Sequence, residues 1–396
     1  MKLIVLSPCP RHASGNVGDQ LLLESALELI EEIHGSTEFE IHWRGEDFTS
    51  RLEYLNSADA ILLCGFEYPE VTDPIQYRLT EDLDKIKPPM IPLSAIHRFF
   101  PGDKKELTKQ RIDTQTRSFL DRVIQNCPNE QIPVRTNWVG QVLRQNDFQT
   151  ILTGDPAWYD PDFIGEPFHA PDEINQLVFT TPHSTLYVEQ AKELLQRCSR
   201  VFPHADRTLV LHSAPNDVDR ELSHAGRKSG WQTHYASHEV NNIDFYRNSD
   251  LHIGYRFHGH LAHLRWRRPS VILAEDSRAQ GLNETFGTAG VRAFDPREGL
   301  VRTLGEIHDW FPVQGIYYFF KNYGADDLLP PQQSLIAGPN PTAIDEVFEF
   351  VQEQRSNDWK AYTAVRDTID ETYKNGMKPF LKSALMPFRK SEQLSP

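Results

Sequence analysis

Cysteine is scarce in this chain, and the few that occur form no recognisable pattern. The four cysteines, Cys9, Cys64, Cys127 and Cys198, are scattered without a CxxC pair. Zinc knuckles and disulfide frameworks both depend on characteristic cysteine spacings. The sequence therefore indicates neither, and it suits a protein of a reducing compartment.

Long apolar runs are absent as well. A membrane-spanning helix needs about 20 consecutive apolar residues, and no stretch of this sequence approaches that length. The N-terminal segment MKLIVLSPCP has a short apolar run that ends at Pro8 and no small-residue cleavage site of the signal-peptide kind. We therefore expect a cytoplasmic protein without a transmembrane segment.

Positive charge is in deficit. Lys and Arg total 41 against 56 Asp and Glu, which gives a formal net charge of −15. Nucleic acids and anionic membranes are bound by broad clusters of cations, so this balance argues against both as partners. An anionic ligand has to meet a local group of arginines instead.

Several motifs that mark common enzymes are missing. The sequence has no P-loop, no GxSxG elbow, no GxGxxG after a strand and no kinase signature. It also has no internal repeat and no low-complexity tract. Phosphate handling, if present, must use another arrangement.

Apolar segments of strand and helix character alternate along the chain. Strands are predicted at 2–7, 38–42, 58–64, 91–94 and 132–134, and helices at 20–33, 80–86, 104–125 and 138–145. Residues 150–176 carry many Gly and Pro without a sustained period, as interdomain linkers do. A second alternating set begins at 177, and amphipathic helices follow at 341–355 and 358–373. The pattern predicts an α/β protein with mostly parallel sheets: a Rossmann-like domain at 1–165, a second at 174–325, and a C-terminal loop with helices at 326–396.

Candidate binding and catalytic side chains are most concentrated in the segment of residues 250–278, DLHIGYRFHGHLAHLRWRRPSVILAEDSR. Its pattern predicts a strand at 251–255, a helix at 259–267 and a second strand at 270–274. Ligands of open α/β sheets bind outside the carboxyl ends of the strands. The charged residues that follow the two strands are Arg256 and His258, then Glu275, Asp276 and Arg278.

These strand-end residues have both functional and structural interpretations. Arg256 can grip a carboxylate or phosphate and His258 can transfer a proton near neutrality, or Arg256 is a buried arginine paired with Asp250 or Asp276. Glu275 and Asp276 supply a general base, or they cap the next helix.

Further candidates lie near other predicted strand ends. Arg135 and His183 each follow a strand and are candidate ligand-binding groups. In the loop Asn16–Asp19, Asp19 is placed to cap helix 20–33, Gly18 allows a sharp turn, and exposed amides could hold an anion. A capped helix after a flexible loop explains this segment equally well.

The histidines of HGHLAHLRW suggest a metal site at first sight. On a helix, residues two apart point about 200° from one another, so His258 and His260 diverge and only His260 and His263 share a face. We therefore predict no metal, and core or surface histidines are the alternative.

Taken together, these motifs resemble the polysaccharide pyruvyl transferase family. The loop Asn16-Val17-Gly18-Asp19 is similar to the family's Asn-x-Gly-Asp motif, and the strand ADAILLCG, Arg135 and Asp155 follow in the expected order. The segment SDLHIGYRFHGHLAHLRWRRPSVILAEDSR resembles the family's late signature of aspartate, strand, Arg-hydrophobic-His, helix, proline and strand. The resemblance covers roughly Leu3 to Gly287.

The resemblance implies a GT-B-like fold, with the two domains facing across a cleft and the C-terminal helices crossing back. It also implies transfer of the enolpyruvyl group of phosphoenolpyruvate to a sugar or lipid-linked glycan, with no other cofactor. The N-terminal domain would be the acceptor side and the second domain the donor side. Arg256 and Arg135 would then clamp the donor, His258 would be the general acid, and Asn16, Gly18, Asp19, His183 and Arg278 would contribute to binding. Uptake of hydroxyl protons by Glu275 or Asp276 is our own inference.

The chain departs from the family pattern in two places. Cys64-Gly65-Phe66 stands where members have a run of glycines, and Thr136 follows Arg135 where an acidic residue is usual. Two alternatives therefore stay open: a GT-B glycosyltransferase or epimerase that uses a UDP-sugar, and a non-catalytic sugar-binding member.

Overall fold

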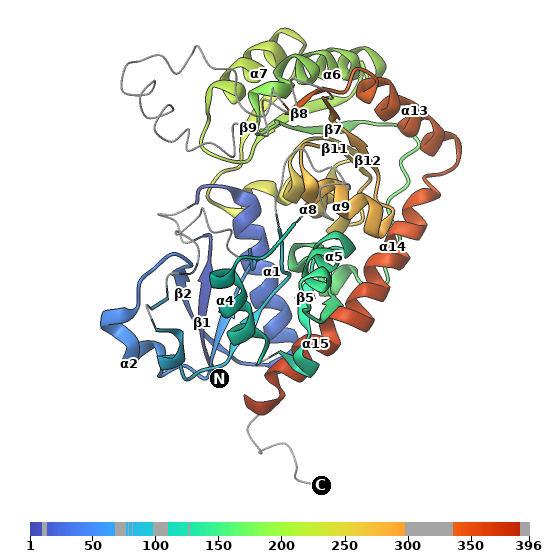
Figure 1. The fold of residues 1–396 in the computed structure, drawn as a ribbon. Helices are drawn as coiled ribbons and strands as arrows, with labels where there is room; N and C mark the ends of the chain where they lie inside the picture. The colour runs from blue at the N-terminus through green and yellow to red at the C-terminus, as the bar shows by residue number, and fades with distance from the viewer. Residues whose placement is uncertain are drawn as a thin grey trace, which may run out of the picture.

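The computed structural model describes residues 1–9, 14–67, 77, 79–80, 82–97, 110–125, 127–297 and 336–388. Two α/β domains lie one above the other in Figure 1, and each is built on a parallel sheet. The C-terminal helices run along one side of both domains.

The N-terminal sheet has the strand order β2-β1-β3-β4, all parallel. Its strands are β1 (Lys2–Ser7), β2 (Glu38–Trp43), β3 (Ala60–Leu63) and β4 (Met90–Pro92). Strand β1 is apolar on both faces because Leu3 and Val5 pack into one hydrophobic core while Ile4 and Leu6 pack into another. A parallel pair, β5 (Ile132–Val134) and β6 (Thr150–Leu152), extends this layer through a bridge between Ala95 and Val134.

Helices complete the N-terminal domain, and short 3₁₀ turns connect the elements. The helices are α1 (Val17–His34), α2 (Leu52–Leu55), α4 (Thr114–Ile124) and α5 (Asn137–Gln145). The 3₁₀ turns of the first two hundred residues are at Thr49–Arg51, Leu83–Lys85, Pro128–Glu130, Pro156–Trp158, Pro161–Phe163 and Thr185–Tyr187.

The second domain has a six-stranded parallel sheet in the order β12-β11-β10-β7-β8-β9. The strands are β7 (Gln176–Thr180), β8 (Asp206–Leu211), β9 (Gln232–Tyr235), β10 (Leu251–Gly254), β11 (Ser270–Ala274) and β12 (Gly290–Arg292). The helices are α6 (Val188–Val201), α7 (Asp217–Lys228), α8 (Phe257–Arg265) and α9 (Ser277–Phe286), with a 3₁₀ segment at Val240–Asn248. The strand order reverses between β7 and β10, as in the Rossmann fold, and ligands bind at such a switch point.

The C-terminal segment returns to the first domain, as predicted. An antiparallel pair of short strands, β13 (Phe294–Pro296) and β14 (Ala337–Pro339), precedes it. Helices α13 (Ala343–Ser356), α14 (Ala361–Thr372) and α15 (Lys378–Leu385) follow, with a π-helical turn at Tyr373–Met377 and a 3₁₀ turn at Met386–Phe388. The return is anchored on α1, where Glu32 accepts hydrogen bonds from Tyr373 Oη at 2.5 Å and Lys378 Nζ at 2.9 Å.

Helix α8 also holds the two domains together. The guanidinium of Arg265, at its last turn, donates to the carbonyl of Tyr159 at 2.7 Å and pairs with Glu28 of α1 at 2.6 Å. Because His258 lies at the first turn of the same helix, this anchor also fixes where His258 sits.

Some predicted elements are wrong in their bounds. Among the described residues of 80–86, only Leu83–Lys85 form a helical turn, in which the side chain of Asp82 accepts from the amide of Asp84. Helix α4 begins at Thr114 because Asp113 accepts hydrogen bonds from the amides of its first turn. Residues 104–109 of the predicted helix, and most of the predicted 326–341 loop, lie outside the described residues.

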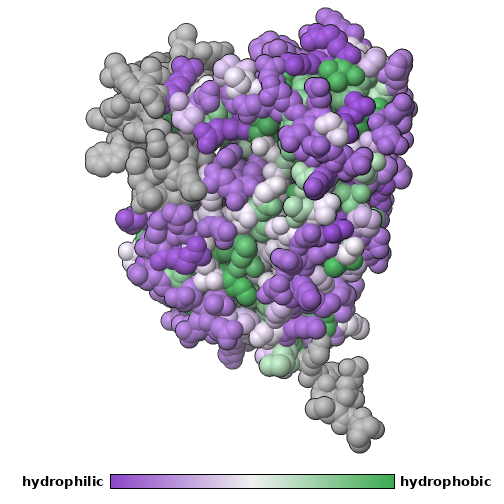
Figure 2. Space-filling model, turned by 90° about the vertical axis from the view of Figure 1, so that its right-hand side faces the viewer, coloured by the Kyte–Doolittle hydropathy of each residue, from purple (hydrophilic) through white to green (hydrophobic). Residues whose placement is uncertain are grey.

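The cysteines are buried, and the face of the molecule in Figure 2 is mostly hydrophilic. All four cysteines are buried free thiols. On the face in Figure 2, hydrophilic side chains predominate and hydrophobic ones gather in a narrow band. Within the described ranges, no helix has both the length and the apolar character to cross a bilayer.

Candidate functional site

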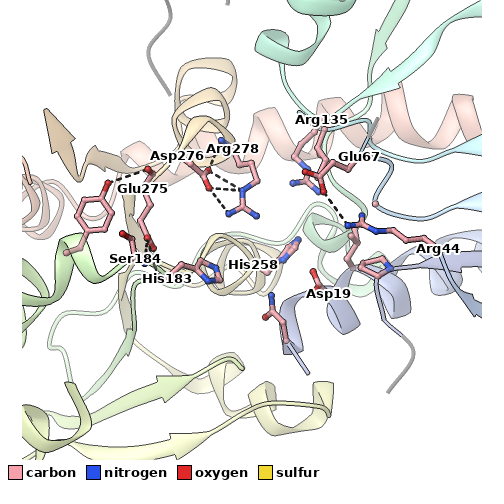
Figure 3. Close-up of a pocket in the computed structure, with 16 residues that line it drawn as sticks. Asp19, Arg44, Glu67, Arg135, His183, Ser184, His258, Glu275, Asp276 and Arg278 are labelled. Atoms are coloured by element: carbon pink, nitrogen blue, oxygen red, sulfur yellow. Dashed lines mark hydrogen bonds and ion pairs between the residues drawn. The ribbon is translucent and has the colours of Figure 1, made fainter. Parts of the chain in front are cut away.

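A cavity of about 630 Å³ lies between the two domains, at the carboxyl ends of their strands. Figure 3 shows His258 between two groups of polar side chains, one from each domain. The lining residues are Pro8, Asn16, Asp19, Leu22, Arg44, Gly65, Glu67, Ile96, Arg135, His183, Ser184, Tyr187, His258, Glu275, Asp276 and Arg278. The structure therefore brings together all the predicted site residues except Arg256 and Gly18.

Gly18 serves packing rather than ligand binding. It lies in the first turn of α1, where an ideal Cβ would be 2.6 Å from both Cβ and Nδ1 of His258. No real Cβ tolerates that distance, so the absence of a side chain lets α1 approach the start of α8. The cap of α1 is Asn16, whose side chain accepts from the Gly18 amide at 3.0 Å, and not Asp19 as predicted. The carboxylate of Asp19 is engaged elsewhere, because it accepts from Ser14 Oγ at 2.7 Å.

Arg256 lies behind the cavity wall instead of on it. Its Nη1 is 2.8 Å from Nε2 of His183, and its Nη2 is 4.0 Å from Oδ1 of the buried Asp219. The predicted partner Asp250 instead accepts from the amides of Asn175 and Gln176. Arg256 therefore supports His183 from behind, and the structure does not place it as a direct clamp.

Arg135 and His258 meet across the cleft on one carboxylate. Arg135 follows β5, is 2% exposed, and its Nη2 lies 2.6 Å from Oδ2 of Asp155. His258 Nε2 lies 4.0 Å from the same oxygen, and the Arg135 guanidinium stacks 4.9 Å from the ring centre of Phe257. Groups distant in the sequence thus form one charged centre.

This centre keeps His258 neutral. Burial, and then the cations Arg135 and Arg278, lower the pKa of His258 well below its ordinary value of 6.5. A neutral imidazole has no spare proton, so the general acid role predicted for His258 requires that it first accept one.

The carboxylates of the second domain are already engaged. Glu275 accepts from the amides of His183 at 2.9 Å and Ser184 at 3.1 Å, which ties the end of β11 to the loop after β7. Asp276 caps α9 through the Arg278 amide at 2.9 Å and pairs with the Arg278 guanidinium at 2.7 Å. Asp276 therefore has the predicted alternative role of a helix cap, and Glu275 is the carboxyl better suited to proton exchange.

The buried carboxyl of Glu275 makes stability depend on pH. Burial is the largest cause that raises the pKa of Glu275 from 4.5 to about 7. Because the folded state holds this proton more tightly than the unfolded chain, the stabilisation is complete below pH 4.5 and is lost as the pH rises through 7. Between those values we expect wild type to lose on the order of 3 kcal/mol relative to Glu275→Gln. The difference between the thermal midpoints of wild type and Glu275→Gln, followed from pH 4.5 to 7, measures this loss. Parallel profiles of the two proteins would contradict the raised pKa of Glu275.

The sequence analysis missed several lining residues. Arg44 follows β2 and pairs at 3.4 Å with Glu67, which lies shortly after β3. Ser184 and Tyr187 follow β7, and Asp155 appeared only within the family pattern. The strand-end rule, applied to the first domain as it was to residues 250–278, would have indicated Arg44 and Glu67.

The other histidines of α8 belong to the core. His260 bonds to Ser270 Oγ through Nδ1 at 2.6 Å. His263 donates from Nδ1 to the carbonyl of Gly259 at 2.7 Å, and its ring stacks 4.4 Å from that of His252. Among the described residues, no group of three or more His, Cys, Asp or Glu is arranged to hold a metal ion.

Two Rossmann-like domains facing across a cleft, with helices that cross back, define a fold of the GT-B class. No family model and no curated protein matches this sequence. Among solved structures, a Listeria monocytogenes protein assigned as a UDP-N-acetylglucosamine 2-epimerase aligns with a TM-score of 0.51 at 11% identity, over 100% of this chain and 98% of that chain. The glycosyltransferase WaaG of lipopolysaccharide biosynthesis aligns with a TM-score of 0.46 at 12% identity, over 98% and 99%. At 11% identity, the likeness to the Listeria structure supports the fold and not the reaction.

Proposed function

We propose that this chain is an enzyme that transfers the enolpyruvyl group of phosphoenolpyruvate to a sugar and closes it into a pyruvate ketal. The observation that supports this best is the meeting of Arg135 and His258 on the carboxylate of Asp155 beside the cavity. The family resemblance singles out these residues, and they come from different domains. The donor assignment rests on that resemblance.

The charge of the cavity suits a small polyanion. Arg44, Arg135 and Arg278 line it, and each is paired with a carboxylate. The phosphate and carboxylate of the donor would compete for these guanidinium groups, which form short charge-assisted hydrogen bonds with such anions. On the first-domain side, Asp19 and Glu67 offer acceptors for sugar hydroxyls.

The reaction balances without an external proton source. A sugar hydroxyl oxygen bonds to C2 of the donor while its hydrogen reaches the C3 methylene, and neutral His258 accepts and passes on that proton. A second hydroxyl oxygen then bonds to C2, the bond from C2 to the phosphate oxygen breaks, and phosphate leaves with the electron pair. Glu275, with a pKa of about 7, is suited to take the second hydroxyl proton.

A UDP-sugar transferase or epimerase is the second candidate, since the fold aligns over its whole length with the Listeria structure. Against it, Asp276 at the end of β11 is held by the Arg278 guanidinium and by the cap of α9, so it is not available to ribose hydroxyls without rearrangement.

The deciding experiment incubates the protein with phosphoenolpyruvate and a panel of pyranosides and lipid-linked glycans. We expect phosphate release together with a pyruvylated product in the mass spectrum. In parallel, thermal midpoints are measured with phosphoenolpyruvate and with UDP-sugars, because a ligand of the folded state raises the midpoint. A rise with a UDP-sugar alone and no phosphate release supports the second candidate. A rise with sugars alone indicates a non-catalytic sugar-binding protein.

A further inference from the structure

The two nitrogens of His258 face different surroundings. Nε2 is buried and has no hydrogen-bond partner. Nδ1 lies on the side of α1, next to Gly18 in its first turn. The proton of a neutral ring occupies one of these nitrogens, and its position decides what the other nitrogen can do.

Asp155 presents an oxygen toward Nε2. Its Oδ1 accepts from the amide of Ala157 at 2.9 Å, and its Oδ2 lies 4.0 Å from Nε2. Although Arg135 Nη2 is 2.6 Å from this Oδ2, the two are not aligned for a hydrogen bond, and Oδ2 has no hydrogen-bond partner. Asp155 is fully buried, so both Oδ2 and Nε2 gain if they approach each other. A shift of about 1 Å brings them to hydrogen-bond distance.

The opposite side of the ring disfavours a proton. The first turn of α1 carries the positive end of the helix dipole, which repels an N–H and favours a lone pair. The charged groups Arg135 and Arg278 also act on His258, and both oppose a second proton. Asp155 is therefore the acceptor that selects the tautomer.

We infer that Asp155 is a positioning residue that holds the proton of His258 on Nε2 and leaves the Nδ1 lone pair to accept a proton from the acceptor sugar. The catalytic consequence rests on the proposed function, whereas the tautomer itself does not. Asp155 would act through His258 and would not touch the substrate.

The test is nitrogen NMR of the full-length protein labelled with ¹⁵N-histidine, with the His258 signals identified by their loss in His258→Gln. In wild type we expect the Nε2–H tautomer. In Asp155→Asn, the carbonyl oxygen is kept toward the Ala157 amide, so the NH₂ group faces Nε2 and the proton is expected on Nδ1. A His258 in the Nδ1–H form in wild type, or a tautomer unchanged by Asp155→Asn, would overturn the inference.

The activity arm separates this inference from the proposed function. If phosphoenolpyruvate is a substrate, Asp155→Asn should lower kcat by about 10²–10⁴-fold and shift the pH profile, as the wrong tautomer does in other His–Asp pairs. A wild-type tautomer on Nε2 that Asp155→Asn reverses, with no phosphate release from any acceptor, leaves the positioning role supported and the proposed reaction refuted. Should Asp155→Asn fail to fold, the wild-type tautomer alone decides, since Nδ1–H would still overturn the inference and Nε2–H would support it.

Discussion

Arg135→Met is expected to lower the free energy of unfolding by about 3–5 kcal/mol, because it leaves the buried carboxylate of Asp155 without its counter-ion. Asp155 is fully buried and Arg135 is 2% exposed, so water cannot replace the lost partner. If phosphoenolpyruvate is the donor, as proposed, the rise in thermal midpoint that it gives wild type should disappear in this variant, since a cavity cation is removed. Thermal and denaturant unfolding, with and without the donor, measure both effects.

Two variants serve as controls for this prediction. Arg44→Met removes another cavity arginine, but its pair with Glu67 is longer and partly exposed, so we expect a loss of only about 1 kcal/mol. The double variant Arg135→Met with Asp155→Leu removes both buried charges and should recover part of the lost stability. Equal losses for Arg135→Met and Arg44→Met would contradict the buried-pair explanation.

His258→Gln is expected to lower the rate of phosphate release by about 10²–10⁴-fold, the usual contribution of a positioned acid-base group. The free energy of unfolding should change by less than about 1 kcal/mol, because Nε2 lies 4.0 Å from Asp155 Oδ2, too far for a full hydrogen bond, and the side chain lies at the cavity wall. Steady-state kinetics and thermal unfolding of the same preparation separate the two quantities.

His260→Gln is the matched control on the same helix. His260 bonds to Ser270 Oγ in the core, away from the cavity lining. Its replacement should cost about 1–2 kcal/mol of stability and leave turnover per folded molecule unchanged. Full turnover by His258→Gln would remove His258 from the proposed mechanism.

Much of the fold follows from local pattern. Segments 251–255 and 270–274 are mostly apolar, and this pattern correctly predicted central strands of a parallel sheet, β10 and β11, with α8 between them. The crossing-back of α13 to α15 was also correct. The helix predicted at 80–86 was wrong, because local caps decided the backbone where the apolar period was weak.

The candidate site was less predictable, because a strand-end position does not determine where a side chain points. Arg256 follows β10 as predicted, yet it turns behind His183 toward Asp219. Gly18 was predicted to lie in a loop, but it belongs to the first turn of α1, and its role depends on how closely α8 approaches. Neither the direction of the Arg256 side chain nor the distance between α1 and α8 can be predicted from the local sequence pattern.

The sequence by itself determined two α/β domains, an excess of acidic over basic residues, and polar residues at the ends of apolar strands. Those properties depend on composition and on the spacing of neighbours along the chain. The tertiary structure alone decided that Arg135, which follows β5, and His258, from α8, share the carboxylate of Asp155. That meeting depends on the docking of α8 against α1, which is a contact between residues far apart in the sequence and is not encoded in any one segment.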